Sequence, residues 1–175
     1  MPEFVRIPGD RVGVLIGSEG ETKKMLENRC NVKLEITGDG GVTITAKDED
    51  GLREWKALDI VKAIGRGFNP RYAVALLKED YALTIIDLYE IFRHKDSDVK
   101  RVKSRIIGES GKAWQTIEDL TNTKMSVYGR TIGIIGLEDD IVLCEQAISM
   151  LIKGAQHQSV YAFLERGRKI QRTGV

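Results

Sequence analysis

A short unit with two glycines occurs twice in this chain, and its fixed spacing constrains the fold more than any other feature. Gly17-Ser18-Glu19-Gly20 and Gly108-Glu109-Ser110-Gly111 lie 91 residues apart. The same offset aligns identical residues beyond each unit: Glu27 with Glu118, Asn31 with Asn122, and Lys33 with Lys124. A match at one offset through a loop, a helix and a strand indicates an internal duplication, so we expect two similar halves.

Apolar periodicity around the first unit predicts the order strand, helix, helix, strand, strand, helix. The strands are expected over residues 4–8, 32–36 and 42–45, and the helices over 12–16, 21–29 and from Asp48 or Asp50 to Arg66. The glycine-rich segment 38–41 marks a turn between the last two strands, which should therefore form a hairpin.

The second unit has the same surroundings. Helices are expected over 99–106 and 113–120, strands over 125–128 and 131–135, a long helix from Asp139 or Asp140 to Lys153, and a further helix over 157–165 that ends in a basic tail, 166–172. Between the halves, a break at 67–70 is followed by a short helix over 72–77 and a β-forming stretch over 82–92. The predicted class is α+β. Its domains are expected at 1–70 and 98–175, with a linker at 71–97 that contains a helix and a strand.

Composition limits the class of protein. With 42% hydrophobic and 30% charged residues, the chain has the composition of a soluble globular protein. Its apolar runs are too short to cross a membrane, and its N-terminus lacks the basic and apolar regions of a secretion signal. Cys30 and Cys144 each lie in an apolar pattern, which indicates reduced core residues in a cytoplasmic protein.

The distribution of charge favours the second half for nucleic-acid binding. Residues 1–70 have 11 Lys or Arg against 12 Asp or Glu, whereas residues 92–175 have 14 against 10. The basic excess therefore lies with the second glycine unit, and that half should dominate any contact with nucleic acid.

No residue pattern points to catalysis. The two histidines, His94 and His157, have no metal-ligand spacing around them. The segment from Gly108 to Lys112 differs from a P-loop because it lacks four residues between the glycines and a Ser or Thr after the lysine. We therefore expect no enzyme activity, no cofactor and no metal site.

Both halves resemble K-homology (KH) domains of type I. The residues that carry the resemblance are Leu15-Ile16-Gly17-Ser18-Glu19-Gly20 and Ile106-Ile107-Gly108-Glu109-Ser110-Gly111-Lys112, each between two helices and followed by a hairpin and a long helix. The resemblance implies two tandem KH domains with an additional C-terminal helix. It also implies a groove in each domain for about four nucleotides of single-stranded RNA, with the glycine loop against the RNA backbone.

The linker between the halves resembles that of one particular family of KH proteins. Residues 67–70, 73–77 and 85–88 are similar to the archaeal family of small-subunit ribosome biogenesis proteins with two KH domains, the counterpart of the eukaryotic partner of Nob. That family implies binding to small-subunit ribosomal RNA (rRNA) near its 3′ end. It also implies cooperation with the endonuclease that matures this end, and with other ribosome assembly or translation factors.

The second loop is the predicted RNA site. Gly108 and Gly111 allow close approach, and Lys112 supplies a cation. The remaining predicted contacts are Glu109 and Ser110 in the loop, Arg101, Lys103 and Arg105 along its approach, and Ile106, Ile107 and Ile117 as an apolar floor. The strand residues 125–127 are expected to read base edges. The alternative is an ordinary turn between helices with a solvated basic face.

The first loop, formed by Gly17, Ser18, Glu19 and Gly20, is expected to bind RNA more weakly. Glu19 and Glu21 place negative charge where a phosphate would lie. The first half is therefore either a weaker RNA binder or mainly a packing partner.

Other interpretations stay open at this point. The chain is alternatively a KH adaptor in another RNA-processing or degradation complex, or a protein-interaction scaffold with silent KH grooves. The basic tail at 166–172 is either an RNA arm or a solvated terminus. Trp55 and Trp114 fall on apolar helix faces and are expected in the core, whereas Tyr128 at a strand end is a candidate for stacking on a base.

Overall fold

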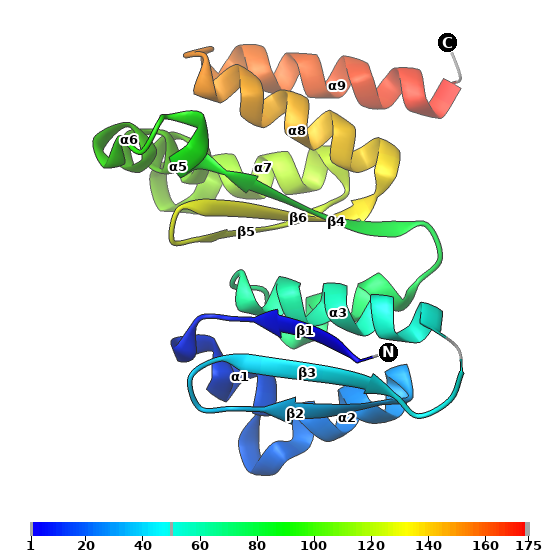
Figure 1. The fold of residues 1–175 in the computed structure, drawn as a ribbon. Coiled ribbons are helices and arrows are strands. Elements are labelled where there is room, and N and C mark those ends of the chain that lie inside the picture. The colour runs from blue at the N-terminus through cyan, green and yellow to red at the C-terminus, as the bar shows by residue number, and fades with distance from the viewer. Residues whose placement is uncertain (1, 50, 174–175) are drawn as a thin grey trace. The chain divides into compact units, whose positions relative to one another are not determined.

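The computed structural model describes residues 2–49 and 51–173. Its contacts divide the chain into two units, Met1–Leu83 and Thr84–Val175, and Figure 1 shows a sheet and helices in each. Within the described residues, no helix is long and apolar enough to cross a membrane.

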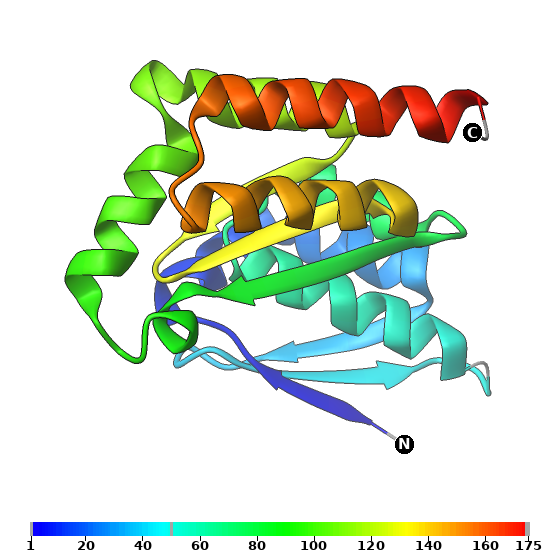
Figure 2. The same cartoon turned by 90° about the horizontal axis from the view of Figure 1, so that it is seen from above.

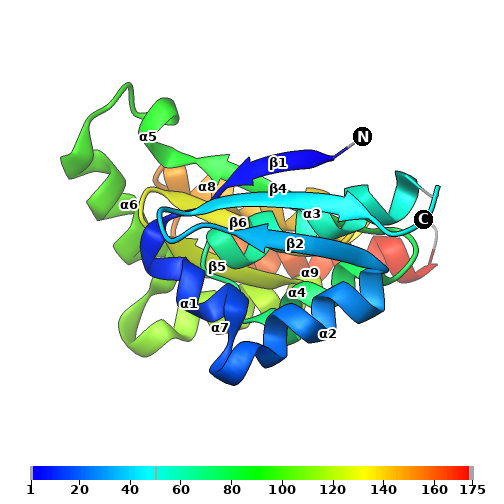
Figure 3. The same cartoon turned by 60° about the horizontal axis from the view of Figure 1, so that its bottom comes forward.

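The first unit has the predicted order of elements. Its strands are β1 (Glu3–Arg6), β2 (Val32–Ile36) and β3 (Gly41–Ala46), its α-helices are α1 (Val12–Ile16), α2 (Glu21–Cys30), α3 (Gly51–Gly65) and α4 (Pro70–Ala73), and its 3-10 helices are η1 (Gly9–Arg11), η2 (Ser18–Gly20) and η3 (Val74–Leu77). The sheet has the order β1-β3-β2, and β3 pairs antiparallel with both neighbours. Figure 3 shows α1 and α2, which the first glycine loop joins.

One face of this first sheet is in the core. Along β2, Val32 and Leu34 are buried whereas Lys33 and Glu35 are exposed, the alternation of a strand with a single buried face. Helix α3 contacts all three strands, and its Ile60 is fully buried.

The second unit repeats the order with two additions. Its strands are β4 (Tyr81–Asp87), β5 (Lys124–Tyr128) and β6 (Thr131–Leu137), and its helices are α5 (Leu88–Ile91), α6 (Asp96–Ile107), η4 (Glu109–Gly111), α7 (Lys112–Thr121), α8 (Glu138–Ile152) and α9 (His157–Thr173). The sheet has the order β4-β6-β5. The additions are α5, which the Asp87 side chain caps, and α9, which packs on α7 and α8 (Figure 2).

The α+β class and the two similar halves are confirmed. Each unit has a three-stranded sheet in which the last strand of the repeat lies in the centre. The contact boundary between Leu83 and Thr84 falls inside the segment 71–97, and β4 from this segment is an edge strand of the second sheet.

The residues that the halves share have the same structural roles. The Glu27 carboxylate accepts a hydrogen bond from a backbone N–H of β2 at 2.9 Å, and Glu118 accepts one from β5 at 2.8 Å. Asn31 and Asn122 end α2 and α7 with φ angles of 54° and 55°. Asparagine tolerates this left-handed position better than most residues. The matches found in the sequence therefore preserve a helix end and its link to the next strand.

Two predictions about the packing are wrong. Helix α9 continues to Thr173, whereas the sequence predicted a helix end near Glu165 and a tail. Trp55, which was expected in the core, is 68% exposed. The neighbouring Glu54 is buried instead, because its Oε1 accepts a hydrogen bond from the Ala46 N–H at 2.9 Å.

Candidate nucleic-acid interface

The second glycine loop joins α6 to α7 through η4. Gly108 has φ 74° and ψ 177°, a region that essentially only glycine occupies. A Cβ atom at Gly108 would lie 2.6 Å from the Cβ of Ala113, so a larger residue does not fit. Ser110 at φ 55° and Gly111 at φ 74° are also left-handed, and they turn the chain into α7. The first glycine is therefore required both by its backbone angles and by its packing.

The outer side of this loop is open. A Cβ atom at Gly111 would meet no atom of the described residues within 4 Å. Gly111 is also the N-cap of the 10-residue helix α7, and it has no side chain to satisfy the N–H groups of the first helical turn. The side chains of Glu109, Ser110 and Lys112 are exposed around it. The Lys112 N–H itself donates to the Glu109 carbonyl oxygen, and no side chain caps the start of the helix. The positive end of the helix dipole beside an exposed lysine is suited to binding a phosphate.

Three basic residues predicted near the loop lie in different surroundings. Lys112 is exposed at the start of α7. Arg101 is exposed on α6, where its Nη2 lies 3.5 Å from Asp98 Oδ1 in a surface ion pair. Lys103 donates from Nζ to the Gly129 carbonyl oxygen at 2.5 Å and so ties α6 to the β5–β6 turn. Lys112 and Arg101 remain accessible to a ligand, whereas Lys103 has a partner in the protein.

Arg105 holds the second unit together. It donates from Nη1 to the Leu151 carbonyl oxygen at 2.9 Å and from Nη2 to that of Ala155 at 2.5 Å. Arg11 makes the same kind of pair after α3 in the first unit, at 2.8 and 2.9 Å. The structure thus gives Arg105 a role in linking α6 to the end of α8, which differs from the RNA contact that the sequence suggested.

The predicted apolar floor is mostly core. Ile106 and Ile117 are 0% exposed, so they support the loop from beneath. Met125 on β5 is also buried. The half-buried apolar and aromatic residues of these elements are Ile107, Trp114, Val127 and Tyr128. An apolar contact with a base would therefore come from this second group.

The first loop has the same backbone but different charges. Gly17 has φ 77° and ψ 173°, and a Cβ atom there would lie 2.3 Å from Thr22 Oγ1. The left-handed position is filled by Glu19 at φ 54°, and Ser18, Glu19 and Glu21 are exposed. Both loops can therefore adopt the form that exposes a helix start, but the first surrounds it with carboxylates.

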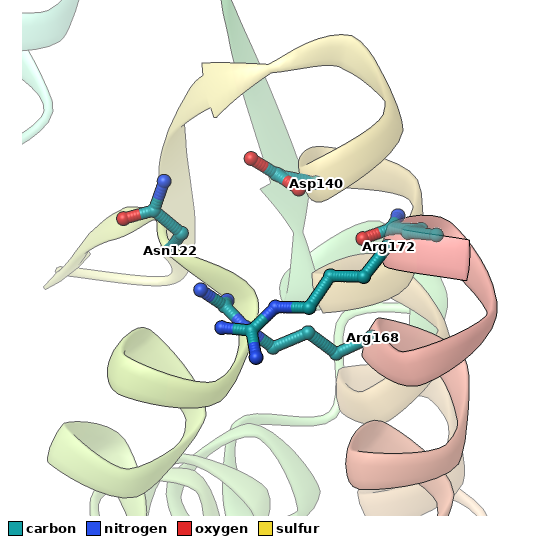
Figure 4. Close-up of a pocket in the computed structure, with 5 residues that line it drawn as sticks. Asn122, Asp140, Arg168 and Arg172 are labelled. Carbon is teal, nitrogen blue, oxygen red and sulfur yellow. The ribbon is translucent and has the colours of Figure 1, made fainter. Parts of the chain in front are cut away.

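The basic residues of the predicted tail belong to a docked helix. Arg168 donates from Nη1 to the Leu120 carbonyl oxygen at 2.9 Å, and Gln171 donates to that of Asp139 at 3.2 Å. These bonds hold α9 against the end of α7 and the start of α8. Figure 4 shows Arg168 and Arg172 pointing from α9 toward the end of α7. They line a hollow of about 170 Å³ together with Asn122, Asp140 and Gln171. Burial raises the pKa of the Asp140 carboxyl, although the nearby Arg168 acts in the opposite direction.

The chemistry available at the second loop is that of anion binding. It offers a helix start that no side chain caps and the exposed Lys112. Within the described parts of the chain, no group of three or more His, Cys, Asp and Glu could hold a metal ion.

Comparison with known proteins identifies the family. Residues 82–169 match the model of the second KH domain of PNO1, described as a eukaryotic type KH domain (KH domain type I), and residues 2–58 match the KH domain model. A KH domain-containing protein of Methanocaldococcus jannaschii is 49% identical over 173 residues, which cover 97% of this chain and 76% of that protein. A chain in the crystal structure of the a/eIF2alpha–aDim2p–rRNA complex from Pyrococcus horikoshii is 45% identical, with a TM-score of 0.90 over 97% of this chain and 94% of that one.

The chain belongs to the Dim2/PNO1 family of KH-domain RNA-binding proteins. The family includes eukaryotic members: the RNA-binding protein pno1 of Dictyostelium discoideum is 34% identical over 110 residues, which are 62% of this chain and 46% of that protein. The match therefore spans less than half of that relative. The resemblance to KH domains of type I, and to this ribosome biogenesis family, is confirmed.

Proposed function

We propose that this protein binds single-stranded small-subunit rRNA near its 3′ end during ribosome maturation, and that the second glycine loop holds the RNA backbone. The observation that carries the proposal is the open start of α7, where no side chain caps the helix at Gly111 and the neighbouring Lys112 is exposed. The Pyrococcus relative supports it, because aDim2p occurs in a complex with rRNA. RNA binding by a KH domain uses this kind of loop against the sugar-phosphate backbone.

The second KH domain dominates in this proposal. Glu19 and Glu21 of the first loop align with Ser110 and Lys112 of the second. From the residue after the first glycine to the first residue of the helix, the formal charge is −2 in the first loop and 0 in the second. Since both loops have nearly the same backbone angles, this difference in charge decides which loop accepts phosphate more readily.

Protein partners form the second part of the proposal. We infer that the chain cooperates with the endonuclease that matures the 3′ end of small-subunit rRNA. The Pyrococcus complex also contains a/eIF2alpha, which favours a translation factor of that kind as a further partner. Co-purification of each candidate partner with the full chain, in the presence and absence of RNA, tests this part.

The test of RNA binding uses acidic substitutions in the loops. The double change Glu109→Asp/Ser110→Asp adds one negative charge in the second loop, and Asp tolerates the left-handed angles of position 110. Affinity for a labelled single strand of the 3′ end should fall about tenfold or more, which corresponds to about 1.4 kcal/mol or more. The matched control is Ser18→Asp, which adds the same charge to the first loop and should have a smaller effect. Unchanged affinity and salt dependence in the double variant would contradict the proposal.

A further inference from the structure

A cationic hollow lies on the first unit, away from its glycine loop. It has a volume of about 310 Å³ and is lined by Arg29, Arg71, Val74, Ala75, Leu77 and Lys78. This size is at the lower end of the range of about 300–1,000 Å³ found for ligand pockets. Arg29 stands nine residues after Gly20 on α2, which places the two about 14 Å apart along the helix axis. The hollow and the first glycine loop therefore mark opposite ends of α2.

The wall formed by α4 and η3 is fixed by specific contacts. Asn69 caps α4, since its Oδ1 accepts a hydrogen bond from the Arg71 N–H at 2.9 Å. Lys56 of α3 donates from Nζ to the Leu77 carbonyl oxygen at 3.0 Å. Leu76 is buried and anchors η3 in the core. These contacts fix the backbone that carries Arg71 and Lys78.

Positive charge accumulates here without acidic neighbours in the lining. Arg29, Arg71 and Lys78 form no ion pair with a carboxylate in the part of the chain that the structure describes. Burial raises the pKa of the adjacent Cys30 thiol, and the charges of Arg29, Arg53 and Lys56 all act against that rise. Arg29 of α2 therefore lines the same hollow as Arg71 and Lys78, and Lys56 of α3 lies beside it at the Leu77 carbonyl oxygen. Such a cluster is stabilised by an anion, because like charges brought together repel one another.

Aromatic rings accompany two of these cations. The Arg71 guanidinium lies 5.3 Å from the centre of the Tyr72 ring, and Lys78 Nζ lies 5.2 Å from that of Tyr81. Tyr72 is 37% exposed. Surfaces that bind single-stranded nucleic acid typically combine cations, which contact the phosphate backbone, with accessible aromatic rings, on which bases stack.

We propose that this hollow binds the phosphate backbone of single-stranded RNA, as a second contact that does not use the first glycine loop. The inference rests on the proposed RNA-binding function and assigns the first KH domain a part in it. The aliphatic floor of Val74, Ala75 and Leu77 is compatible with a ribose or a base edge, and the three cations with phosphates. The hollow on the second unit differs, because Asp140 lines it together with its two arginines.

The test removes the three cations and measures binding of two RNAs by the full chain. The variant is Arg29→Gln/Arg71→Gln/Lys78→Gln. The matched control is Lys33→Gln/Lys47→Gln/Lys62→Gln, which removes three exposed cations of the same unit outside the hollow. One RNA has about eight nucleotides, about twice the footprint of one KH groove, and the other has about 40. Circular dichroism and thermal unfolding confirm that each variant is folded.

The hollow variant should bind the long RNA about tenfold or more less tightly at about 0.1 M salt, and its salt slope should be smaller by about 2, as expected for the loss of three phosphate contacts. The control should keep the wild-type slope to within about 1. The short RNA should still bind through the second loop. An unchanged affinity and slope for the long RNA, or loss of an acidic protein partner without loss of RNA, would overturn this inference. Failure of the underlying function shows separately, as wild-type affinity of Glu109→Asp/Ser110→Asp for the short RNA.

Discussion

Substitution of Arg105 should lower the stability of the protein without changing its affinity for RNA. In Arg105→Met, the Ala155 carbonyl oxygen loses its donor, whereas the Leu151 carbonyl oxygen keeps a second one, the Gly154 N–H at 3.1 Å. Since a hydrogen bond from a charged group is worth about 1.5–3 kcal/mol and this site is only partly buried, we expect the free energy of unfolding to fall by about 2 kcal/mol. RNA affinity and its salt slope should stay at the wild-type values, because the Arg105 guanidinium already donates to two carbonyl oxygens of the protein.

Urea unfolding followed by circular dichroism measures the first quantity, and fluorescence anisotropy with labelled RNA measures the second. Arg101→Met is the matched control from the same helix. Its surface ion pair with Asp98 is worth less than about 1 kcal/mol, so its stability should change little while its RNA affinity falls. Arg11→Met should reproduce the loss of stability in the first unit. If Arg105→Met kept full stability and lost RNA binding about tenfold, the structural role of Arg105 would be refuted.

Four further outcomes follow from the loop and the core. Gly111→Ala should lower the unfolding free energy by about 1 kcal/mol, the cost of a left-handed alanine in open space. Gly108→Ala should cost about 3 kcal/mol or more, because strain and a clash add there, and equal losses in both variants under urea would contradict the loop geometry. Burial raises the pKa of Cys144 to about 12 and also raises that of Cys30, so neither thiol of the native protein should react with iodoacetamide at neutral pH. As pH rises above 9.0, the ordinary thiol value, only the unfolded state ionises Cys144, so stability should fall, and rapid native alkylation near neutral pH would show that the thiol is accessible.

The duplication made the fold predictable, because the same loop, helix and strand patterns occur in both halves of the sequence. The loops, the Glu27 and Glu118 pair and the helix-ending asparagines occur at one offset, and the structure gives each pair one role. Local patterns of glycine and apolar residues were therefore sufficient for the repeated elements and their order. They did not predict α5, which lies in the stretch 82–92 that was expected to be β-forming.

Packing between distant residues was not predictable from these patterns. Trp55 is exposed and the neighbouring Glu54 is buried, and the Glu54 carboxylate accepts a hydrogen bond from a backbone N–H of β3. The periodicity of apolar residues along one helix does not indicate such a contact with another element. Arg105 looked like part of a basic face, yet its partners lie 46 and 50 residues further along the chain. Likewise, Arg168 donates a hydrogen bond to a carbonyl oxygen of α7, and α9 continues past the predicted end of the helix.

The candidate sites could likewise be predicted only where they depend on residues close together in the sequence. The glycine spacing predicts a loop between two helices at residues 108–111, and the structure has one there, whereas Ile106 and Ile117 of the predicted apolar floor are buried. No sequence pattern indicates the cationic hollow, because Arg29 is 42 residues before Arg71 and this half of the chain has no net basic excess.

Crosslinking of the full chain to small-subunit rRNA tests the central claim most directly. The protein is irradiated with precursor rRNA that carries photoreactive nucleotides, and both the crosslinked peptides and the crosslinked nucleotides are then identified. We predict crosslinks between nucleotides near the 3′ end and residues 101–128, and a marked loss of them in Glu109→Asp/Ser110→Asp. Crosslinks that spare this segment, or that fall elsewhere on the rRNA and are unaffected by the double substitution, would contradict the account.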